Sequence, residues 1–359
     1  MKHIFNIITV LTALLVTSCV KGEYVTEVDN DLKTNYETFW NLINDNYCFL
    51  GENYGYCKMV GGEKLDWNKV YEEMMPKVEA AKTEEELLDI MGKSIDYLQD
   101  GHVWIDTKFK HRGCFTFYNI AYPNTERYPE NFINGLIRNE ILDYAYKTRN
   151  SHLYGTITRG DKKFFYLHHA EFTRDLIKED LEMFKPLLDE ADGFIYDIRT
   201  NLGGSAQLSF NIAGRFVKEK TLVGYQVLKS GKGHNDLTEP SPLYVVPSKD
   251  GYNWSDIKTV VLTNRDVYST ANMFASYMKE VPNATVIGGI TGGGGGDPCS
   301  FYLPNGWTIT MSGKKMSLDV DKVHIERGVE PDIEVNITAE DIANKYDRIL
   351  EKAIEVLSK

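Results

Sequence analysis

The stretch "DGFIYDIRTNLGGSAQLSFNIAGRFV", residues 192–217, decides how this chain folds. An apolar run ends at Asp197, two glycines follow at Gly203 and Gly204, and a run with apolar residues at helical spacing comes next. This order predicts a buried strand, a tight turn and a helix. The sequence repeats the plan at "IKTVVLTNRDVYSTANMFASYMKEV", residues 257–281. Strands that alternate with helices predict an α/β core with a largely parallel sheet, whose strand ends carry the site.

The segment before this core has a different pattern. Residues 30–108 contain three stretches with apolar residues at three and four spacing, and Thr83 followed by Glu86 forms a capping box. We therefore predict a small α-helical domain there, broken at Gly101 in "LQDGHVWIDTKF". Residues 109–160 show no clear period and are interpreted as a connector. The core is expected over residues 161–345 and a C-terminal helix over 346–359.

The first residues have the layout of an export signal. A basic start at Lys2 precedes an apolar run that is short for a transmembrane span, and the segment ends in "VTSC". This ending resembles the lipobox of bacterial lipoproteins, which implies lipidation at Cys19. We expect residues 1–18 to be a signal peptide and residues 19–29 a tether. The protein would then be an extracytoplasmic, membrane-anchored lipoprotein, in the periplasm or at the cell surface.

Composition excludes some classes of function. The formal net charge of −12 and the lack of a dense basic stretch argue against a nucleic acid partner. Outside the cytosol the cysteines after Cys19 can form disulfides, and Cys48 with Cys57 is the first pair to expect, leaving Cys114 and Cys299. No CxxC or HExxH pattern is present, so we expect no metal site.

Several residues near the predicted strand ends are candidates for chemistry. Ser269 opens a helix after a buried strand, so it is either a nucleophile or a helix cap. Gly203 and Gly204 could present backbone N–H groups to an anion, or could only shape a tight turn. His102 could be a general base, although a lone His in a turn is more often structural. Glu326, in "KVHIERGVEPDIEV", is one of 52 acidic residues.

Taken together, these motifs resemble one enzyme family. "FIYDIRTNLGGS" is similar to the D-x-R-x-N-x-GG segment of the C-terminal processing and tricorn-core serine peptidases, and "YSTANMFA" to their S-x-A-E-x-F-A segment. "GGITGGGGGDP" and "GVEPDIEV" resemble later motifs, in the family's order. With the helical domain that ends in D-x-H, the resemblance covers most of residues 30–345. It implies an α/β fold of the ClpP/crotonase-like kind behind a small helical domain.

The resemblance also implies a mechanism. Ser269 would attack a peptide carbonyl, His102 would be the general base, and Glu326 would orient His102, with Glu330 or Asp332 as alternatives for that acid. The net reaction would be hydrolysis of a peptide bond in a peptide or unfolded protein. No cofactor is implied, because side chains and backbone amides suffice.

An oxyanion hole is implied as well. It would consist of the backbone N–H groups of Gly203 or Gly204 and of Thr270. Each of these residues lies at the start of a predicted helix, where backbone N–H groups lack intrahelical acceptors.

The sequence departs from the family's pattern at three places. The processing branch has a Lys base within T-x-GK-G, whereas this chain has "TGGGGGD", which favours the Ser-His branch. Asn272 stands where the family usually has Glu. The connector offers no clear place for a PDZ domain.

These departures leave a second function open. A catalytically weak or inactive binding lipoprotein could keep the peptidase fold to hold peptides or glycans. The reason to consider it is that Asn272 replaces the family's usual Glu. A nucleotide site is disfavoured because no P-loop Lys follows the glycines and Pro298 stands where a helix should begin. A glycosidase would need a specific pair of carboxylates, which the sequence does not single out.

Overall fold

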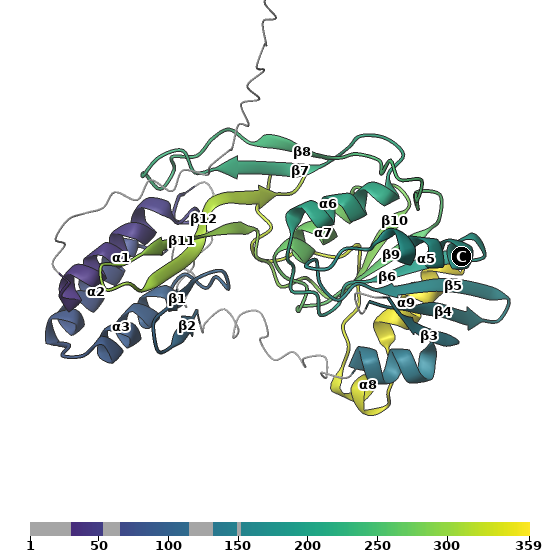
Figure 1. Cartoon of the computed structure of the whole chain (residues 1–359), viewed down its shortest axis with the longest axis horizontal. Coiled ribbons are helices and arrows are strands. Elements are labelled where there is room, and N and C mark those ends of the chain that lie inside the picture. Colours follow the sequence, from purple (N-terminus) through teal and green to yellow (C-terminus); the bar gives the residue numbers. More distant parts are fainter. Residues whose placement is uncertain (1–29, 53–64, 115–131, 149–151) are drawn as a thin grey trace, which may run out of the picture.

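The computed structural model describes residues 30–52, 65–114, 132–148 and 152–359. Two lobes lie at opposite ends of the molecule, and long strands connect them (Figure 1). The export signal, Cys19 and Cys57 lie outside the described residues. Within the described part of the chain, no helix has the length and apolar character needed to cross a bilayer.

Three helices form the first lobe: α1 (Leu32–Asn46), α2 (Trp67–Ala80) and α3 (Glu84–Asp96). Each helix begins after a side chain that accepts a hydrogen bond from its first turn. The capping box predicted for Thr83 and Glu86 is present at the start of α3. The helices therefore begin where their sequence signals indicate.

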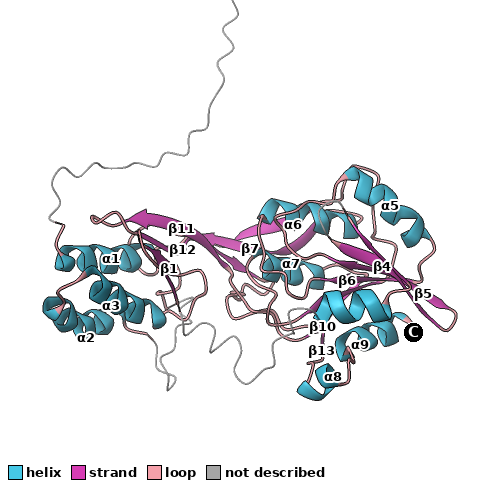
Figure 2. Cartoon of the chain, turned by 60° about the horizontal axis from the view of Figure 1, so that its bottom comes forward, coloured by secondary structure: helices cyan, strands magenta, loops and turns pink. Residues whose placement is uncertain are grey.

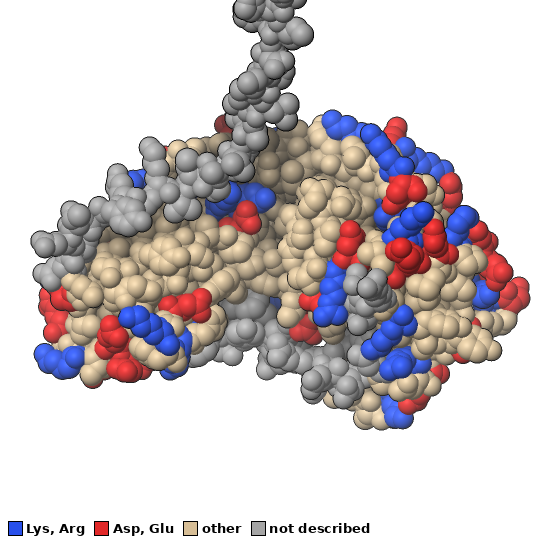
Figure 3. Space-filling view, in the orientation of Figure 1, with Lys and Arg blue, Asp and Glu red and all other residues tan. Residues whose placement is uncertain are grey.

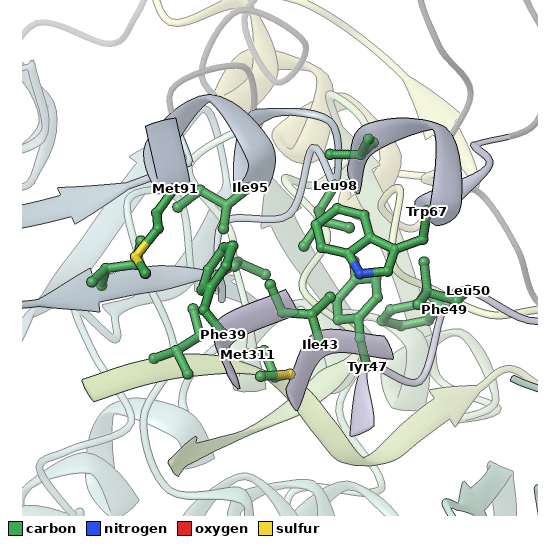
Figure 4. Packing of buried hydrophobic residues seen from close by; sticks show 14 of the residues in the cluster. Phe39, Ile43, Tyr47, Phe49, Leu50, Trp67, Met91, Ile95, Leu98 and Met311 are labelled. Atoms are coloured by element: carbon green, nitrogen blue, oxygen red, sulfur yellow. The ribbon is translucent and has the colours of Figure 1, made fainter. Parts of the chain in front are cut away.

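The helices pack against a six-stranded sheet with the order β2-β1-β12-β7-β8, in which β11 also pairs with β12. Its strands are β1 (Trp104–Asp106), β2 (His111–Gly113), β7 (Thr221–Leu228), β8 (Ser241–Val245), β11 (Gly296–Tyr302) and β12 (Thr308–Leu318). Met311 of β12 lies in the same buried cluster as Phe39 and Ile43 of α1 (Figure 4). The helical lobe thus completes its core with strands from the C-terminal half of the chain.

The second lobe contains a seven-stranded sheet with the order β13-β10-β9-β6-β5-β4-β3. The strands are β3 (Tyr144–Lys147), β4 (Leu153–Arg159), β5 (Lys162–His168), β6 (Gly193–Asp197), β9 (Thr259–Thr263), β10 (Ala284–Gly288) and β13 (Ile333–Glu334). Pairing is parallel from β13 through β5, as the alternation of strands and helices predicts, and antiparallel from β5 to β3. The segment expected as a connector therefore contributes two strands to the core sheet.

Helices cover both faces of this sheet (Figure 2). One face carries α5 (Lys178–Asp189), α6 (Ala206–Ala213) and α7 (Thr270–Lys279), followed after α6 by the short 3-10 turn η2 (Gly214–Phe216). The other face packs against η1 (Phe132–Ile141) and α9 (Arg348–Leu357), with α8 (Ala339–Ala343) beside them. Because both faces are covered, every residue of β6 and β9 is buried. The α/β fold behind a helical segment is the architecture expected from the sequence.

The described cysteines do not support the expected local disulfide. Cys48, Cys114 and Cys299 are free thiols, and Cys48 is fully buried. Burial raises the pKa of the Cys48 thiol well above its usual value, with the charges of Asp100 and Glu326 adding to the effect. Cys48 is therefore a buried, unreactive group of the core.

Candidate active site

Ser269 lies in the tight turn between β9 and α7, one residue before the helix begins. Its backbone has φ 56° and ψ −125°, which a residue with a Cβ adopts only at a cost on the order of 1–3 kcal/mol. The Ser269 side chain makes no capping hydrogen bond to α7. The structure therefore decides against the helix-cap interpretation and gives Ser269 the geometry of a nucleophile turn.

Two glycine loops hold this strained turn. The Ser269 N–H donates to the Gly293 carbonyl at 2.8 Å. A Cβ at Gly203 would lie 2.9 Å from the Ser269 Cβ, and a Cβ at Gly294 would lie 3.0 Å from the Ser269 nitrogen. Both glycines also have positive φ, of 102° and 83°. Only glycine fits at these two positions, so the loops can close around the serine.

His102 comes to Ser269 from the other lobe. It lies between the end of α3 and β1, and its Nε2 is 3.0 Å from the Ser269 Oγ, although 167 residues separate the two. The Tyr268 ring packs against the imidazole, with 4.9 Å between ring centroids. Both residues of this predicted pair are thus brought into hydrogen-bond contact.

The environment of His102 favours its neutral form. The residue is only 7% exposed, and burial lowers the pKa of its imidazole. The charges of Asp100 and Asp297 act in the opposite direction, toward the imidazolium. A neutral imidazole at pH 7 can accept the serine proton, and the nearby carboxylates can stabilise the cation that this transfer forms.

The predicted role of Glu326 stays a prediction, because the structure gives it no direct hydrogen bond to His102. Glu326 is buried near the site, but its Oε2 accepts hydrogen bonds from the N–H groups of Gly295 at 2.6 Å and Gly296 at 3.1 Å. His102 Nδ1 has no acceptor among the described residues. In the structure Glu326 thus binds the glycine loop, where it satisfies two buried amides.

The two alternative acids do not reach the imidazole either. The Asp332 carboxylate accepts from the Val286 N–H at 2.8 Å and pairs with Lys279, and Glu330 is exposed. The acid that is hydrogen-bonded to His102 is Asp100, whose Oδ1 accepts from the His102 backbone N–H at 2.7 Å. Asp100 was not among the residues predicted from the sequence. The D-x-H spacing was its signal, because an Asp often accepts from the backbone N–H two residues ahead.

The N–H groups expected to form an oxyanion hole lie in the turn after β6 and at the start of α7. The Gly203 N–H donates to the Asn201 Oδ1 at 2.9 Å, so it is already engaged. The N–H groups of Gly204 and Thr270 have no acceptor among the described residues. The Thr270 Oγ1 donates to the Gly204 carbonyl at 2.8 Å and ties the two turns together. Of the expected donors, Gly204 and Thr270 are therefore the pair available to an oxyanion.

A cleft of about 160 Å³ opens beside Ser269. Small residues form much of its wall, including Gly204, Ala206 and Gly294, while Met273 and Lys315 also line it. A larger hollow of about 980 Å³ lies between α5, α6 and the end of β8, and none of the predicted catalytic residues lines it. The chemistry therefore belongs to the smaller cleft.

Asn272 has a defined place although it departs from the family's Glu. Its side chain is fully buried, donates to the Ile325 carbonyl at 2.9 Å and accepts from the Thr291 Oγ1 at 2.5 Å. Asn272 thus connects α7 to both loops that border the site.

The structure also explains why this chain lacks the Lys base of the processing branch. Gly294 occupies its place in the "TGGGGGD" turn, and a Cβ there would lie 2.7 Å from the Tyr268 ring. The described residues include no group of three or more His, Cys, Asp or Glu side chains that could hold a metal ion.

The fold and this site define a serine-type peptidase. A model of peptidase family S41 matches residues 163–335, and a model of the tricorn protease C1 domain matches residues 29–95. The chain is 35% identical to a solved structure from Parabacteroides merdae described as a candidate peptidase, with a TM-score of 0.78 over 92% of this chain and 97% of that one. This chain belongs to peptidase family S41.

More distant relatives include peptidases by name and by fold. A carboxyl-terminal-processing protease of Synechocystis is 27% identical over 54% of this chain, and the match spans only 43% of that protein's own length. The crystal structure of mature CPAF is 13% identical, with a TM-score of 0.67 over 91% of this chain and 96% of that one, and this likeness concerns the fold alone.

Proposed function

We propose that this protein is a lipid-anchored, extracytoplasmic serine endopeptidase with Ser269 as nucleophile and His102 as general base. The observation that carries the proposal is the 3.0 Å contact between the Ser269 Oγ and the His102 Nε2. A strained serine that makes no cap hydrogen bond, facing a mostly neutral buried imidazole, is the arrangement that an activated hydroxyl requires.

Acylation would proceed in two proton transfers. As the Ser269 Oγ forms a bond to the peptide carbonyl carbon, its proton passes to the His102 Nε2. The carbonyl oxygen becomes an oxyanion, which the N–H groups of Gly204 and Thr270 would stabilise. The C–N bond then breaks, and His102 returns the proton to the leaving amine. This leaves an acyl-enzyme on Ser269.

Deacylation would reverse these roles. A water molecule gives a proton to His102 as it attacks the ester carbonyl, and the same two N–H groups stabilise the second oxyanion. The C–O bond to Ser269 breaks, the serine recovers the proton from His102, and a carboxylic acid leaves.

The substrate would be an extended peptide or an unfolded protein segment. The cleft beside Ser269 has a volume of about 160 Å³, which suits a small or medium side chain better than a whole folded surface. Lys and Arg alternate with Asp and Glu on the face seen in Figure 3, so no basic field favours a nucleic acid there.

Anchoring would occur through Cys19, as the lipobox-like "VTSC" suggests. Expression of the full chain in a bacterial host with Cys19→Ser as the comparison tests this part. The wild type should incorporate labelled palmitate and sediment with membranes. Equal labelling of the Cys19→Ser variant would refute lipidation at this residue.

Peptidase activity is tested by intact-mass labelling with a fluorophosphonate. The protein, cut to begin after Cys19, should gain one adduct, and Ser269→Ala and His102→Ala should gain none. Ser300→Ala is the matched control, because this serine is exposed on β11 and should leave labelling unchanged.

The same protein preparation decides between the enzyme and the binding lipoprotein. The wild type should cleave an unstructured protein such as casein, and Ser269→Ala should not. A folded wild type that neither takes up the label nor cleaves casein would exclude the peptidase and leave a protein that only binds peptides or glycans.

A further inference from the structure

The larger hollow of the core lobe has the lining of a binding site. It lies between the segment that leads into α5, the helix α6 and the chain that follows β8 (Figure 1), and its volume of about 980 Å³ is in the range of ligand-binding pockets. Apolar side chains come from all three segments: Leu176 and Leu181, Phe210, and Tyr244 with Val246. The hollow thus offers one continuous apolar surface that three parts of the chain build together.

Folding leaves part of this lining in water. Tyr244 is 41% exposed and Val246 is 56% exposed. The Lys220 ammonium lies 3.9 Å from the centroid of the Tyr244 ring and holds this ring at the rim. Covering exposed apolar side chains that lie together is favourable, so an apolar partner gains free energy by entering the hollow.

The loop after β8 that closes one side of the hollow is held in place by a buried arginine. Arg215, whose side chain is 7% exposed, donates to the two Asp250 carboxylate oxygens at 2.9 Å and 2.7 Å and to the Tyr252 carbonyl at 3.0 Å. The Ser248 N–H also donates to the Gly214 carbonyl at 2.9 Å. These bonds fix the loop to the end of α6, so a ligand does not have to order it on binding.

Two helices connect the hollow with the cleft beside Ser269. On α6, Ala206 lines the cleft and Phe210, four residues later on the same side of the helix, lines the hollow. On α7, Met273 lines the cleft, and Tyr277, again four residues later, stacks on Phe210 with 4.9 Å between ring centroids. Four residues of helix span about 6 Å, and an extended peptide advances about 3.3 Å per residue. A peptide with one side chain in the cleft therefore reaches the hollow a few residues further along.

A sheet edge beside the hollow suits a peptide backbone. β8 is the last strand of its sheet, so one edge of it has no neighbour among the described strands. A peptide that pairs with this edge would place alternate side chains on the face of Tyr244, which lines the hollow. The sheet also extends to the cleft, because Ser241 of β8 pairs with Gln226, and Gln226 pairs with Ser317 in the cleft wall. Backbone pairing would give affinity, and the hollow would select apolar side chains.

We propose that the hollow is an exosite of the peptidase, which binds apolar side chains of an extended peptide substrate a few residues away from the bond cleaved at Ser269. The inference rests on the proposed peptidase function and deepens it by naming the substrate class: an unfolded segment with apolar residues on one side of the cleaved bond. The charged residues at the rim have both signs, Lys178 and Lys249 against Asp175 and Asp250. Apolar contact, and not net charge, would therefore select the substrate.

The first test measures binding without turnover. Protein that begins after Cys19 and carries Ser269→Ala is titrated into fluorescein-labelled casein, and fluorescence anisotropy gives the Kd. Adding Val246→Asp should weaken binding roughly fivefold or more, because it places a charge in the apolar lining. Val323→Asp is the matched control, since Val323 is 57% exposed in the loop after β12, outside both cavities, and should leave the Kd unchanged.

A second pair of variants removes an aromatic ring without adding charge. Tyr244→Ser should weaken casein binding in the same direction as Val246→Asp. Tyr346→Ser is its control, because Tyr346 is 45% exposed and also has a cation over its ring, that of Arg348, but lies outside the hollow. In the active protein, Val246→Asp and Tyr244→Ser should raise KM for casein by the same factors as they raise the Kd. They should leave kcat and the rate of fluorophosphonate labelling within about twofold of wild type, whereas a distorted fold would lower both.

Three results would overturn the exosite. One is casein binding that does not saturate, and another is an equal Kd for the hollow variants and their controls. The third is a dimer, seen by sedimentation velocity, that Val246→Asp separates while casein binding stays unchanged, because the hollow would then be a contact between two copies of this chain. Failure of the peptidase proposal itself is distinguishable, since the wild type would take up no fluorophosphonate, whereas failure of the exosite alone leaves labelling intact.

Discussion

At the scale of single residues, the site depends on backbone positions that only glycine can occupy. Ser269 has a strained conformation because Gly203 and Gly294 approach it closely from two other loops. Ser269 can keep this strained conformation because Gly203 and Gly294 have no side chains that would collide with it. Substitution at these glycines tests this dependence directly.

Gly203→Ala should reduce the labelling rate of Ser269 at least tenfold. Its Cβ would lie 2.8 Å from both the Thr270 nitrogen and the Tyr268 carbonyl oxygen, so the nucleophile turn must shift. Gly160→Ala is the matched control, since Gly160 also has positive φ, 62°, but has open space around it. Equal rates for Gly203→Ala and wild type would show that the turn does not need this close approach.

The pH dependence of the rate should follow His102. Because burial lowers the pKa of this imidazole, the active neutral form persists below its ordinary value of 6.5. The rate of Ser269 labelling should therefore stay level as pH falls through about 6.5 and decline only at lower pH. An acid limb centred above 6.5 would contradict the depressed pKa.

At the scale of elements, hydrogen bonds connect α7 to the two loops that border the cleft, those of Thr291 and Ile325. Asn272 forms one hydrogen bond to each loop from a fully buried position, and Thr291 extends the connection by accepting from the Val329 N–H at 2.6 Å. The element that carries Ser269 is thus positioned by a neutral amide where the family usually has a carboxylate.

Asn272→Ala should destabilise the fold by about 1–3 kcal/mol, because the buried Thr291 hydroxyl loses its acceptor and the Ile325 carbonyl loses one of its donors. The labelling rate of Ser269 should also fall, since α7 loses its contact with both loops. Asn211→Ala on the exposed surface of α6 is the control and should change neither quantity. Urea unfolding with and without the substitution measures the free energy. An unchanged unfolding midpoint would mean that water replaces both bonds.

At the scale of the whole molecule, buried histidines connect folding to pH. His152, His168 and His169 lie in the core sheet lobe, and burial is the main cause that lowers the pKa of each. The unfolded chain takes up protons on these groups below about 6.5, whereas the folded chain resists protonation. Their contribution to stability is therefore fully present above pH 6.5 and is lost as pH falls through the folded values.

The loss should be visible in the variant His152→Phe. The folded pKa of His152 is about 4, so this residue alone accounts for a decrease on the order of 3 kcal/mol between pH 6.5 and 4. The variant should lose less unfolding free energy over this interval than wild type, as measured by urea titration at each pH. Identical slopes for the variant and the wild type would exclude His152 as a source of acid sensitivity.

The sequence by itself determined the local elements and indicated Ser269 and His102 as the predicted catalytic pair. The apolar strands, the capping box at Thr83 and the glycine turns each depend on neighbours within a few residues, so periodicity and motif order were enough to predict them. Ser269 and His102 were paired because the motifs around them resemble those of the C-terminal processing and tricorn-core serine peptidases. The order of these motifs indicated that family.

Only the tertiary structure decided which groups surround that pair. Which backbone groups Glu326 and Asp100 bind, and whether Gly203 or Gly204 offers a free N–H, depends on hydrogen bonds that form only after the loops around His102 and Ser269 pack. The same holds for the strands between residues 144 and 159, whose weak pattern becomes a sheet only against β5. Hydrogen-bond partners and desolvation depend on groups brought together across long sequence separations, and a linear pattern does not contain that information.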